Sequence, residues 1–320
     1  MKARLSRFAR GLAALLPAML GFLFWSAPAA AAPCQINCLT PGDYSITTLH
    51  GGLLRNYLVH VPASYDGSRA VPLLLDYHGF SKDAANERQW SGQLAESDKR
   101  GFIAVWPNGL VLSWNAYGCC FLDNALNIDD VSFSRAVIAA MKGRANIDAN
   151  RVFVTGISNG GGMAQRMACE AADVVRAAVS VSYPLNRENC TPAKPISVWE
   201  IAGTADETIG YYGGTPPLPL LPNNLLGVPL GVQGARESLA AWKRILGCSD
   251  TLHREQLPDG TRYAGSRFEE YRGCGGVRTG LVTIVNGEHV LYNGYTELGS
   301  DPDKAPIDVA PFIWDRFFTM

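Results

Sequence analysis

Short apolar runs recur along the chain, and segments with helical spacing of apolar residues separate them. Runs of five to seven residues suit strands that are buried on both faces. The repeated order of strand and helix therefore favours an α/β fold, with a mostly parallel central sheet and helices on both faces. We predict strands over residues 71–77, 102–106, 151–155, 177–181, 196–202 and 281–285.

Two segments outside this repeat also have readable patterns. Residues 44–49 and 54–61 alternate apolar and polar side chains, and a pair of glycines lies between them, which indicates an antiparallel hairpin at the edge of the sheet. Further along, Asp129 and Asp130 precede apolar residues at helical spacing, and we interpret both carboxylates as helix caps.

The composition is that of a globular protein with a mildly acidic body. Of the 320 residues, 47% are hydrophobic and 18% are charged, and the formal net charge is -1. Four of the basic residues lie in the first ten positions, so removing them from -1 leaves -5 for the rest. Binding to nucleic acid needs clustered Lys and Arg, and we expect no such partner.

The first 31 residues have the pattern of a secretory signal peptide. A basic start leads into an apolar run over 11–25, and an alanine-rich stretch suited to cleavage follows. This run has fifteen residues, fewer than the ~20 that a membrane-spanning helix needs, so we expect no membrane association after cleavage. Residues 32–320 are then expected to form one secreted domain, extracellular or periplasmic, with a loop or lid insertion near 211–233.

Export changes the interpretation of the eight cysteines, because an oxidising compartment favours disulfides over metal thiolates. Their spacing offers no zinc-ligand pattern, and we expect no metal site. Two pairs close loops of about twenty to thirty residues and are candidate disulfides, Cys169 with Cys190 and Cys248 with Cys274. The pairing of the other four stays open: Cys34, Cys38, Cys119 and Cys120.

One short motif carries a specific chemistry. Directly after the strand at 151–155 comes Gly156-Ile157-Ser158-Asn159-Gly160, and a helical pattern follows. This is Gly-x-Ser-x-Gly in the strand-turn-helix context of a nucleophile elbow, where the serine projects from a strained turn and the glycines avoid collisions with neighbouring backbone. Ser158 is therefore the candidate nucleophile.

A serine hydroxyl needs a base, and only five histidines are available. With His78 set aside as part of the oxyanion segment described next, His289 alone follows a buried-looking strand. It stands on a loop where open α/β sheets place their sites, so it is the candidate base. A carboxylate between serine and histidine in the chain must orient that base, and Asp206 is our choice, with Glu207 as its competitor.

The same chemistry needs two backbone N–H groups that bind an oxyanion. Asn159, the residue after the nucleophile, supplies the first of them. For the second we choose Phe80, because Gly79 before it lets the backbone approach the site. His78 is then expected to be structural.

An ordered set of motifs extends over nearly the whole chain after residue 31. The motifs are His78-Gly79, Trp106-Pro107-Asn108-Gly109, Trp114-Asn115, Cys119-Cys120, Asp129-Asp130-Val131, Gly156 to Gly160, Gly203-Thr204-Ala205-Asp206 and Gly287-Glu288-His289. This set resembles the secreted family of polyhydroxybutyrate depolymerases, feruloyl esterases and acetyl xylan esterases. The resemblance implies an α/β-hydrolase fold and supports Ser158, Asp206 and His289 as a catalytic triad. One departure is that the family usually follows its histidine with x-Trp-Pro-Gly, which this chain lacks.

These features together predict a serine carboxylic ester hydrolase that forms an acyl-enzyme and needs no cofactor. We favour feruloyl or acetyl xylan ester hydrolysis on plant cell-wall esters over polyester depolymerisation, because no residues remain for an added polymer-binding domain. A catalytically silent carbohydrate-binding protein on a hydrolase scaffold is the alternative from another class. Trp114 and Tyr117 are tentative substrate-binding residues, with core packing as an equal alternative. The partner is a small-molecule or polymeric ester, and the oligomeric state stays open.

Overall fold

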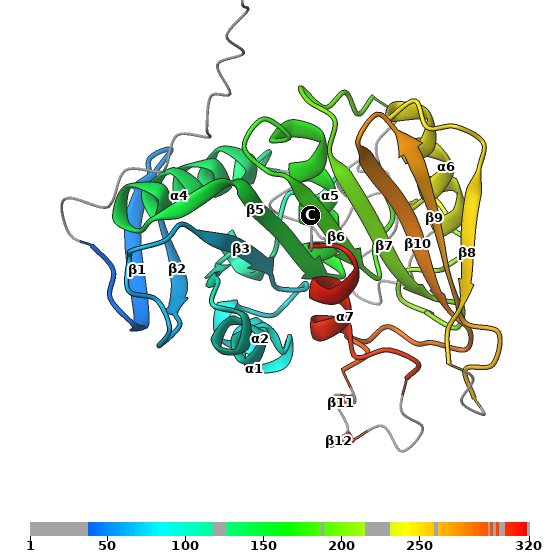
Figure 1. The fold of residues 1–320 in the computed structure, drawn as a ribbon, viewed down its shortest axis with the longest axis horizontal. Helices are drawn as coiled ribbons and strands as arrows, with labels where there is room; N and C mark the ends of the chain where they lie inside the picture. Colours follow the sequence, from blue (N-terminus) through cyan, green and yellow to red (C-terminus); the bar gives the residue numbers. More distant parts are fainter. Residues whose placement is uncertain are drawn as a thin grey trace, which may run out of the picture. The chain divides into compact units, whose positions relative to one another are not determined.

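A central sheet organises the computed structural model, which describes residues 38–117, 126–186, 189–214, 231–258, 262–293, 295–296, 299–300 and 305–318. These residues lie within one unit that extends over Ala31–Met320. Within them the sheet has ten strands in the order β1-β2-β4-β3-β5-β6-β7-β10-β9-β8 (Figure 1). The strands are β1 (Gly42–His50), β2 (Leu53–Val61), β3 (Val71–Tyr77), β4 (Ile103–Pro107), β5 (Ile147–Ile157), β6 (Ala177–Val181), β7 (Ser197–Gly203), β8 (Leu252–Gln256), β9 (Arg267–Cys274) and β10 (Val277–Ile284).

The middle of the sheet is parallel and both of its edges are antiparallel. Parallel pairing joins β4, β3, β5, β6, β7 and β10. The hairpin of β1 and β2 lies antiparallel at one edge, as the alternating pattern predicts. At the other edge β9 and β8 add antiparallel strands that the sequence analysis missed. A separate small ribbon pairs β11 (Tyr295–Thr296) with β12 (Gly299–Ser300).

Helices cover both faces of the sheet (Figure 1). One apolar cluster joins the sheet to α4, α5 and α6, and a second joins its other face to α1, α2 and α7. Neighbouring residues of β3 divide between the two clusters, since Leu73 and Leu75 belong to the first and Leu74 to the second. The helices are α1 (Ala84–Trp90), α2 (Gln93–Arg100), α4 (Asp130–Arg144), α5 (Asn159–Glu170), α6 (Ala235–Ile245) and α7 (Val309–Arg316), with a 3-10 turn η1 (Leu110–Leu112).

The two aspartates before α4 have different roles. Asp129 caps the helix, because its carboxylate accepts a hydrogen bond from the Ser132 N–H at 2.9 Å. The interpretation of Asp130 as a second cap is wrong. Its side chain is buried, pairs with Arg55 at 2.7 Å and accepts from the Asn115 N–H at 2.9 Å. Asp130 therefore joins the hairpin to the segment that precedes the helix.

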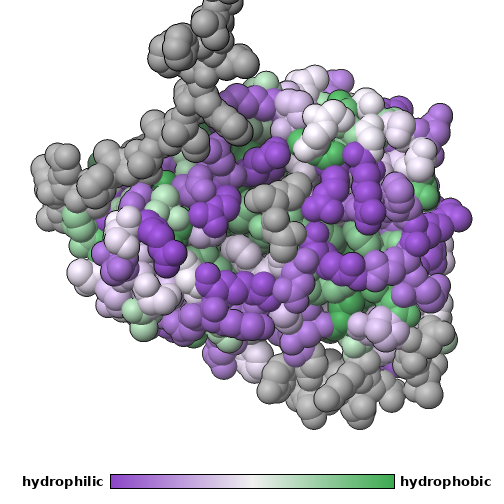
Figure 2. All heavy atoms as spheres, viewed as in Figure 1, coloured by the Kyte–Doolittle hydropathy of each residue, from purple (hydrophilic) through white to green (hydrophobic). Residues whose placement is uncertain are grey.

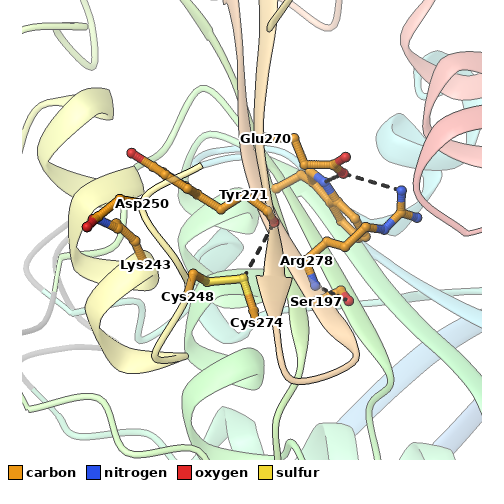
Figure 3. The surroundings of a disulfide bond; sticks show 9 residues. Ser197, Lys243, Cys248, Asp250, Glu270, Tyr271, Cys274 and Arg278 are labelled. Carbon is orange, nitrogen blue, oxygen red and sulfur yellow. Dashed lines mark hydrogen bonds and ion pairs between the residues drawn. A yellow bond between two sulfur atoms is a disulfide. The ribbon is translucent and has the colours of Figure 1, made fainter. Parts of the chain in front are cut away.

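Both predicted disulfides are confirmed. Cys169 at the end of α5 is bonded to Cys190, and Cys248 after α6 is bonded to Cys274 at the end of β9 (Figure 3). The first bond fixes the helix that follows the elbow, and the second fixes α6 to the antiparallel edge. Cys38 is disulfide-bonded as well. Cys34, Cys119 and Cys120 lie outside the described residues.

The surface of the described part is mainly hydrophilic with scattered apolar side chains in the view of Figure 2. In the described ranges, no helix combines the length and the apolar character that crossing a bilayer requires. Of the predicted insertion at 211–233, residues 215–230 lie outside the described ranges. Its base is closed by an antiparallel bridge between Gly214 and Val232. The predicted signal peptide at 1–31 lies outside the described ranges too.

Candidate active site

Ser158 occupies a sharp turn between β5 and α5. Its backbone has φ 56° and ψ -126°, a conformation that non-glycine residues rarely adopt and that costs about 1–3 kcal/mol unless the surroundings enforce it. The surroundings here are crowded backbone. A Cβ atom on Gly156 would lie 2.5 Å from the Tyr77 carbonyl oxygen, and one on Gly160 only 2.0 Å from it. The glycines of the motif are thus required because β3 passes directly against the turn.

Asp206 and His289 meet at the carboxyl ends of β7 and β10, which are neighbours in the sheet. The Oδ2 atom of Asp206 lies 2.7 Å from Nδ1 of His289. Because a carboxylate only accepts, Nδ1 carries the proton, and the second ring nitrogen is left to act as a base. The other oxygen of Asp206 accepts from the N–H groups of Thr208 and Ile209, at 2.9 and 2.7 Å.

The competing carboxylate does not reach the histidine. Glu207 is exposed, whereas Asp206 is buried. The two loops are also joined by backbone, since the Ala205 N–H donates to the Gly287 carbonyl at 2.9 Å. The structure therefore pairs His289 with Asp206 and not with Glu207.

A pocket of about 440 Å³ opens beside the serine and the histidine. Ser158 and His289 both line it, and both lie at the carboxyl edge of the parallel strands. The other residues that line the pocket fall into an apolar, partly aromatic group and a polar group. The apolar members are Gly79, Phe80, Trp90, Ile157, Val290 and Leu291, and the polar members are Lys82, Asn86, Glu87 and Asn293.

The two segments chosen for the oxyanion flank Ser158. Gly79 follows β3 closely enough that a Cβ atom on it would contact the Ser158 Cβ at 3.6 Å, and Phe80 comes next in the chain. Asn159 is the first residue of α5, where backbone N–H groups have no partner within the helix. The Asn159 side chain accepts a hydrogen bond from the Trp114 N–H at 2.7 Å and donates one to the Trp114 carbonyl at 3.0 Å.

His78 supports this loop and is structural, as expected. It is fully buried, and burial lowers the pKa of its imidazole to about 4, so the ring is neutral. Its Nε2 atom accepts from the Gly109 N–H at 3.0 Å, while Nδ1 lies 2.8 Å from the Gly79 carbonyl oxygen. A neutral ring thereby fixes the segment that carries Gly79 and Phe80.

The prediction that Trp114 binds substrate is wrong, because this side chain is fully buried. Its Nε1–H donates to the His78 carbonyl at 3.0 Å and its ring packs 5.1 Å from that of Tyr77. Tyr117 does not line the pocket either: its ring lies 4.8 Å from the Arg166 guanidinium and its hydroxyl bonds Glu170. Trp114 thus supports the segment of His78, and Tyr117 packs against α5.

Sequence reasoning missed the aromatic wall. Trp90 lies at the end of α1 and is 45% exposed, although it is a large apolar residue. No local motif marks it, because it reaches the pocket through the packing of α1 against the sheet. Its exposure is visible only in three dimensions. Together with Phe80, Val290 and Leu291 it lines the apolar part of the pocket.

A pair of buried carboxyl groups, Asp76 and Glu87, lies next to the pocket. Burial raises the pKa of Asp76 on β3 to about 7, and burial together with the neighbouring Asp76 charge raises the pKa of Glu87 on α1 well above its usual range. The Trp106 Nε1–H donates to Asp76 at 3.0 Å, and Glu87 is hydrogen-bonded to it as well. Glu87 is thus the protonated partner, and it is neutral where it lines the pocket.

Comparison with known proteins identifies relatives of the chain. No family model matches the chain. It is 30% identical over 250 residues to feruloyl esterase B of Piromyces equi, covering 75% of this chain and 43% of that protein. It is also 30% identical over 203 residues to "Probable feruloyl esterase C" of Aspergillus terreus, covering 61% of this chain and 69% of that one.

Among solved structures, acetyl xylan esterase from Aspergillus awamori superposes with a TM-score of 0.54 at 12% identity, over 78% of this chain and 94% of that one. At this identity the likeness concerns the fold, which is that of an α/β-hydrolase. The sequence relatives add the family. The chain belongs to the esterase family that contains the feruloyl esterases, a family of carboxylic ester hydrolases. It spans less than half the length of the Piromyces relative.

Proposed function

We propose that the protein is a serine carboxylic ester hydrolase that acts through an acyl-enzyme on plant cell-wall esters, as a feruloyl or acetyl xylan esterase. Ser158 is the nucleophile, His289 the base and Asp206 the residue that orients the base. The observation that carries the proposal is the 2.7 Å bond between Asp206 and His289 at the same pocket that Ser158 lines. Relatives named feruloyl esterase support the substrate class.

The reaction follows from the chemistry of these groups. The Nε2 atom of His289 takes the proton of the Ser158 hydroxyl as its oxygen attacks the ester carbonyl. The backbone N–H groups of Phe80 and Asn159 bind the negative oxygen of the tetrahedral intermediate, and the N-terminus of α5 favours the same charge. The intermediate collapses as His289 returns the proton to the departing alcohol. Water then attacks the acyl carbon while His289 takes its proton, and His289 returns that proton to the Ser158 oxygen as the acid leaves.

The pocket supports a bulky acyl group. Its volume of about 440 Å³ greatly exceeds what an acetyl group fills, and Phe80 and Trp90 offer two aromatic surfaces. Aromatic side chains pack well against a planar ring. The Asn86 and Lys82 side chains provide polar contacts for the hydroxyl or sugar groups of such an ester.

We propose secretion as the destination of the chain. The N-terminal pattern is that of a signal peptide, and the bonds Cys169–Cys190 and Cys248–Cys274 are of the kind that persists in oxidising compartments.

A panel of esters tests the function. Methyl ferulate, acetylated xylan, p-nitrophenyl acetate and hydroxybutyrate oligomers are offered to the wild type, with Ser158→Ala as the control for background hydrolysis. Hydrolysis of methyl ferulate or acetylated xylan that disappears in S158A supports the proposal. Activity confined to hydroxybutyrate oligomers would instead assign a polyester depolymerase. No hydrolysis of any ester would favour a silent binding protein.

A further inference from the structure

Tyr292 lies three residues after His289, and its hydroxyl reaches back to the backbone beside that histidine. The side chain is buried, with 2% exposed, and its O–H donates to the Glu288 carbonyl oxygen at 2.5 Å. The carbonyl of Glu288 belongs to the peptide bond that enters His289. A displacement of this peptide would therefore move the imidazole directly.

The same hydroxyl also lies against the loop that carries Asp206. A Cβ atom on Gly203, at the end of β7, would lie 2.2 Å from the Tyr292 oxygen, and one on Gly287 would lie 2.7 Å from it. Gly203 leads into residues 204–209, which carry Asp206 and are called the acid loop. Gly287 lies in residues 285–291, which carry His289 and are called the histidine loop. Because both residues are glycines, the Tyr292 hydroxyl has room to pack between the two loops.

The ring of Tyr292 is fixed independently of its hydroxyl. It belongs to the apolar cluster that includes Ile284 and Ile307. Its own carbonyl accepts from the Val309 N–H at 3.1 Å, at the start of α7. The phenol is therefore anchored in the core at one end and touches both loops at the other.

The backbone of Tyr292 is strained, which gives a second and separate observation. Its φ is 50°, in the left-handed region that is unusual for a bulky residue. Strain of this kind persists where the surroundings fix the conformation, and it clusters at functional sites. With this backbone conformation the side chain of Tyr292 reaches back along the chain to the Glu288 carbonyl.

We propose that Tyr292 is a positioning residue for the triad: its hydroxyl sets the distance between the acid loop and the histidine loop, and so maintains the bond between Asp206 and His289. This inference rests on the proposed function. It assigns Tyr292 no contact with substrate, and its effect passes through the imidazole. Loss of the hydroxyl therefore slows acylation without weakening the binding of the ester.

The test compares Tyr292→Phe with Tyr65→Phe in the full chain. Tyr65 is a matched control because it is also buried and its hydroxyl accepts a hydrogen bond from a backbone group, the Asn146 N–H at 2.7 Å, on residues that do not line the pocket. Hydrolysis of p-nitrophenyl acetate, the rate of fluorophosphonate labelling and Tm are measured for both variants. The wild type must hydrolyse the ester and be labelled at Ser158; if it does neither, the proposed function fails before Tyr292 is tested.

We expect Y292F to lower kcat and the labelling rate by roughly three- to tenfold with KM within twofold, because one hydrogen bond has that worth. The acid limb of its kcat/KM profile should move to lower pH, since a loosened carboxylate stabilises the imidazolium less. Y65F should lower Tm but leave kcat and the profile unchanged. Equal kcat and profile in Y292F and wild type, or equal losses of kcat in Y292F and Y65F, would overturn the proposal.

One further variant keeps the inference testable even if the phenylalanine variant folds poorly. Tyr292→4-aminophenylalanine retains the ring and a hydrogen-bond donor, and it should keep kcat within about threefold of wild type. A larger loss at native Tm contradicts the role of the donor. In the Asp206→Asn background Y292F should have little further effect on kcat, because both act through His289. Full additivity of the two losses would contradict a role through that bond.

Discussion

Asp206 and His289 are bonded at 2.7 Å although 83 residues separate them in the chain. The sheet order explains the contact, because β7 and β10 are parallel neighbours and both loops leave at the same edge. The second carboxylate oxygen of Asp206 is occupied by the N–H groups of Thr208 and Ile209. The backbone of its own loop thus fixes the Asp206 carboxylate on the side opposite the imidazole.

Asp206→Asn tests this relationship. An amide at this position can donate to Nδ1 and stabilise the wrong tautomer of His289, so kcat should fall by roughly 10³–10⁴-fold with little change in Tm. Glu207→Gln is the control, because Glu207 is exposed beside it. Steady-state kinetics on p-nitrophenyl acetate should give E207Q within twofold of wild type. The assignment of the carboxylate is wrong if E207Q is the more damaged variant.

Trp90→Ala tests the aromatic wall. Removing the indole takes away a stacking surface for an aromatic acyl group, so KM for methyl ferulate should rise by about tenfold while p-nitrophenyl acetate is hardly affected. Leu49→Ala is a suitable control, since Leu49 is exposed on the hairpin and does not line the pocket. If KM for both esters responds equally to W90A, Trp90 does not select the acyl group.

The acid pair of Asp76 and Glu87 should make stability depend on pH. The pKa of Asp76 is raised to about 7 in the folded protein, from 3.8 when unfolded, so the native state holds more protons across that window. The contribution of this pair to the free energy of unfolding is therefore fully present below about pH 4. It is lost as the pH rises toward 7 and beyond.

Glu87→Gln checks this sign. Glutamine keeps an N–H donor for Asp76 and removes the titrating carboxyl of Glu87, so the stability of E87Q relative to wild type should increase as pH rises from 5 to 8. Urea unfolding of both proteins at each pH gives the difference. A difference that is constant with pH, or that shrinks as pH rises, would rule out the pair as the source.

The two described disulfides offer a comparison at nearly equal loop length, with separations of 21 and 26 residues. Replacing either pair by serine should cost about 2–5 kcal/mol of stability. Only Cys169→Ser with Cys190→Ser should also lower kcat by several-fold, because Cys169 ends the helix that begins next to Ser158. Thermal unfolding and kinetics of the two double variants decide this. Equal effects on kcat would show that α5 needs no such anchor.

Much of this architecture can be read from the sequence, because its signals are local. The strands at 71–77 and 177–181 are continuous apolar runs, and the elbow around Ser158 is a contiguous motif whose glycines have a steric reason. Strand β9 was missed since its Glu269 and Glu270 are charged residues that the fold buries. Their arginine partners lie partly in the strand itself and partly on α6, β8 and β10. The pattern of a charged strand is indistinguishable from that of a loop.

The substrate wall was hidden from the sequence for a related reason. Trp114 stands in one of the motifs that carry the family resemblance, but its side chain is buried and its indole N–H donates to the His78 carbonyl. Trp90 has no motif, and it reaches the pocket only because α1 packs over the edge of β3 and β4. Which of the two tryptophans lines the pocket depends on packing between segments, and no local pattern encodes it.

The most direct test of the account is the site of covalent modification by an acyl-enzyme mimic. The wild type and Ser158→Ala are incubated with a fluorophosphonate, and intact mass and peptide mapping are recorded at increasing times. We predict one adduct per chain, located on the peptide that contains Ser158, with loss of ester hydrolysis in parallel and no adduct in S158A. An adduct on another residue with hydrolysis retained in S158A would contradict the serine mechanism.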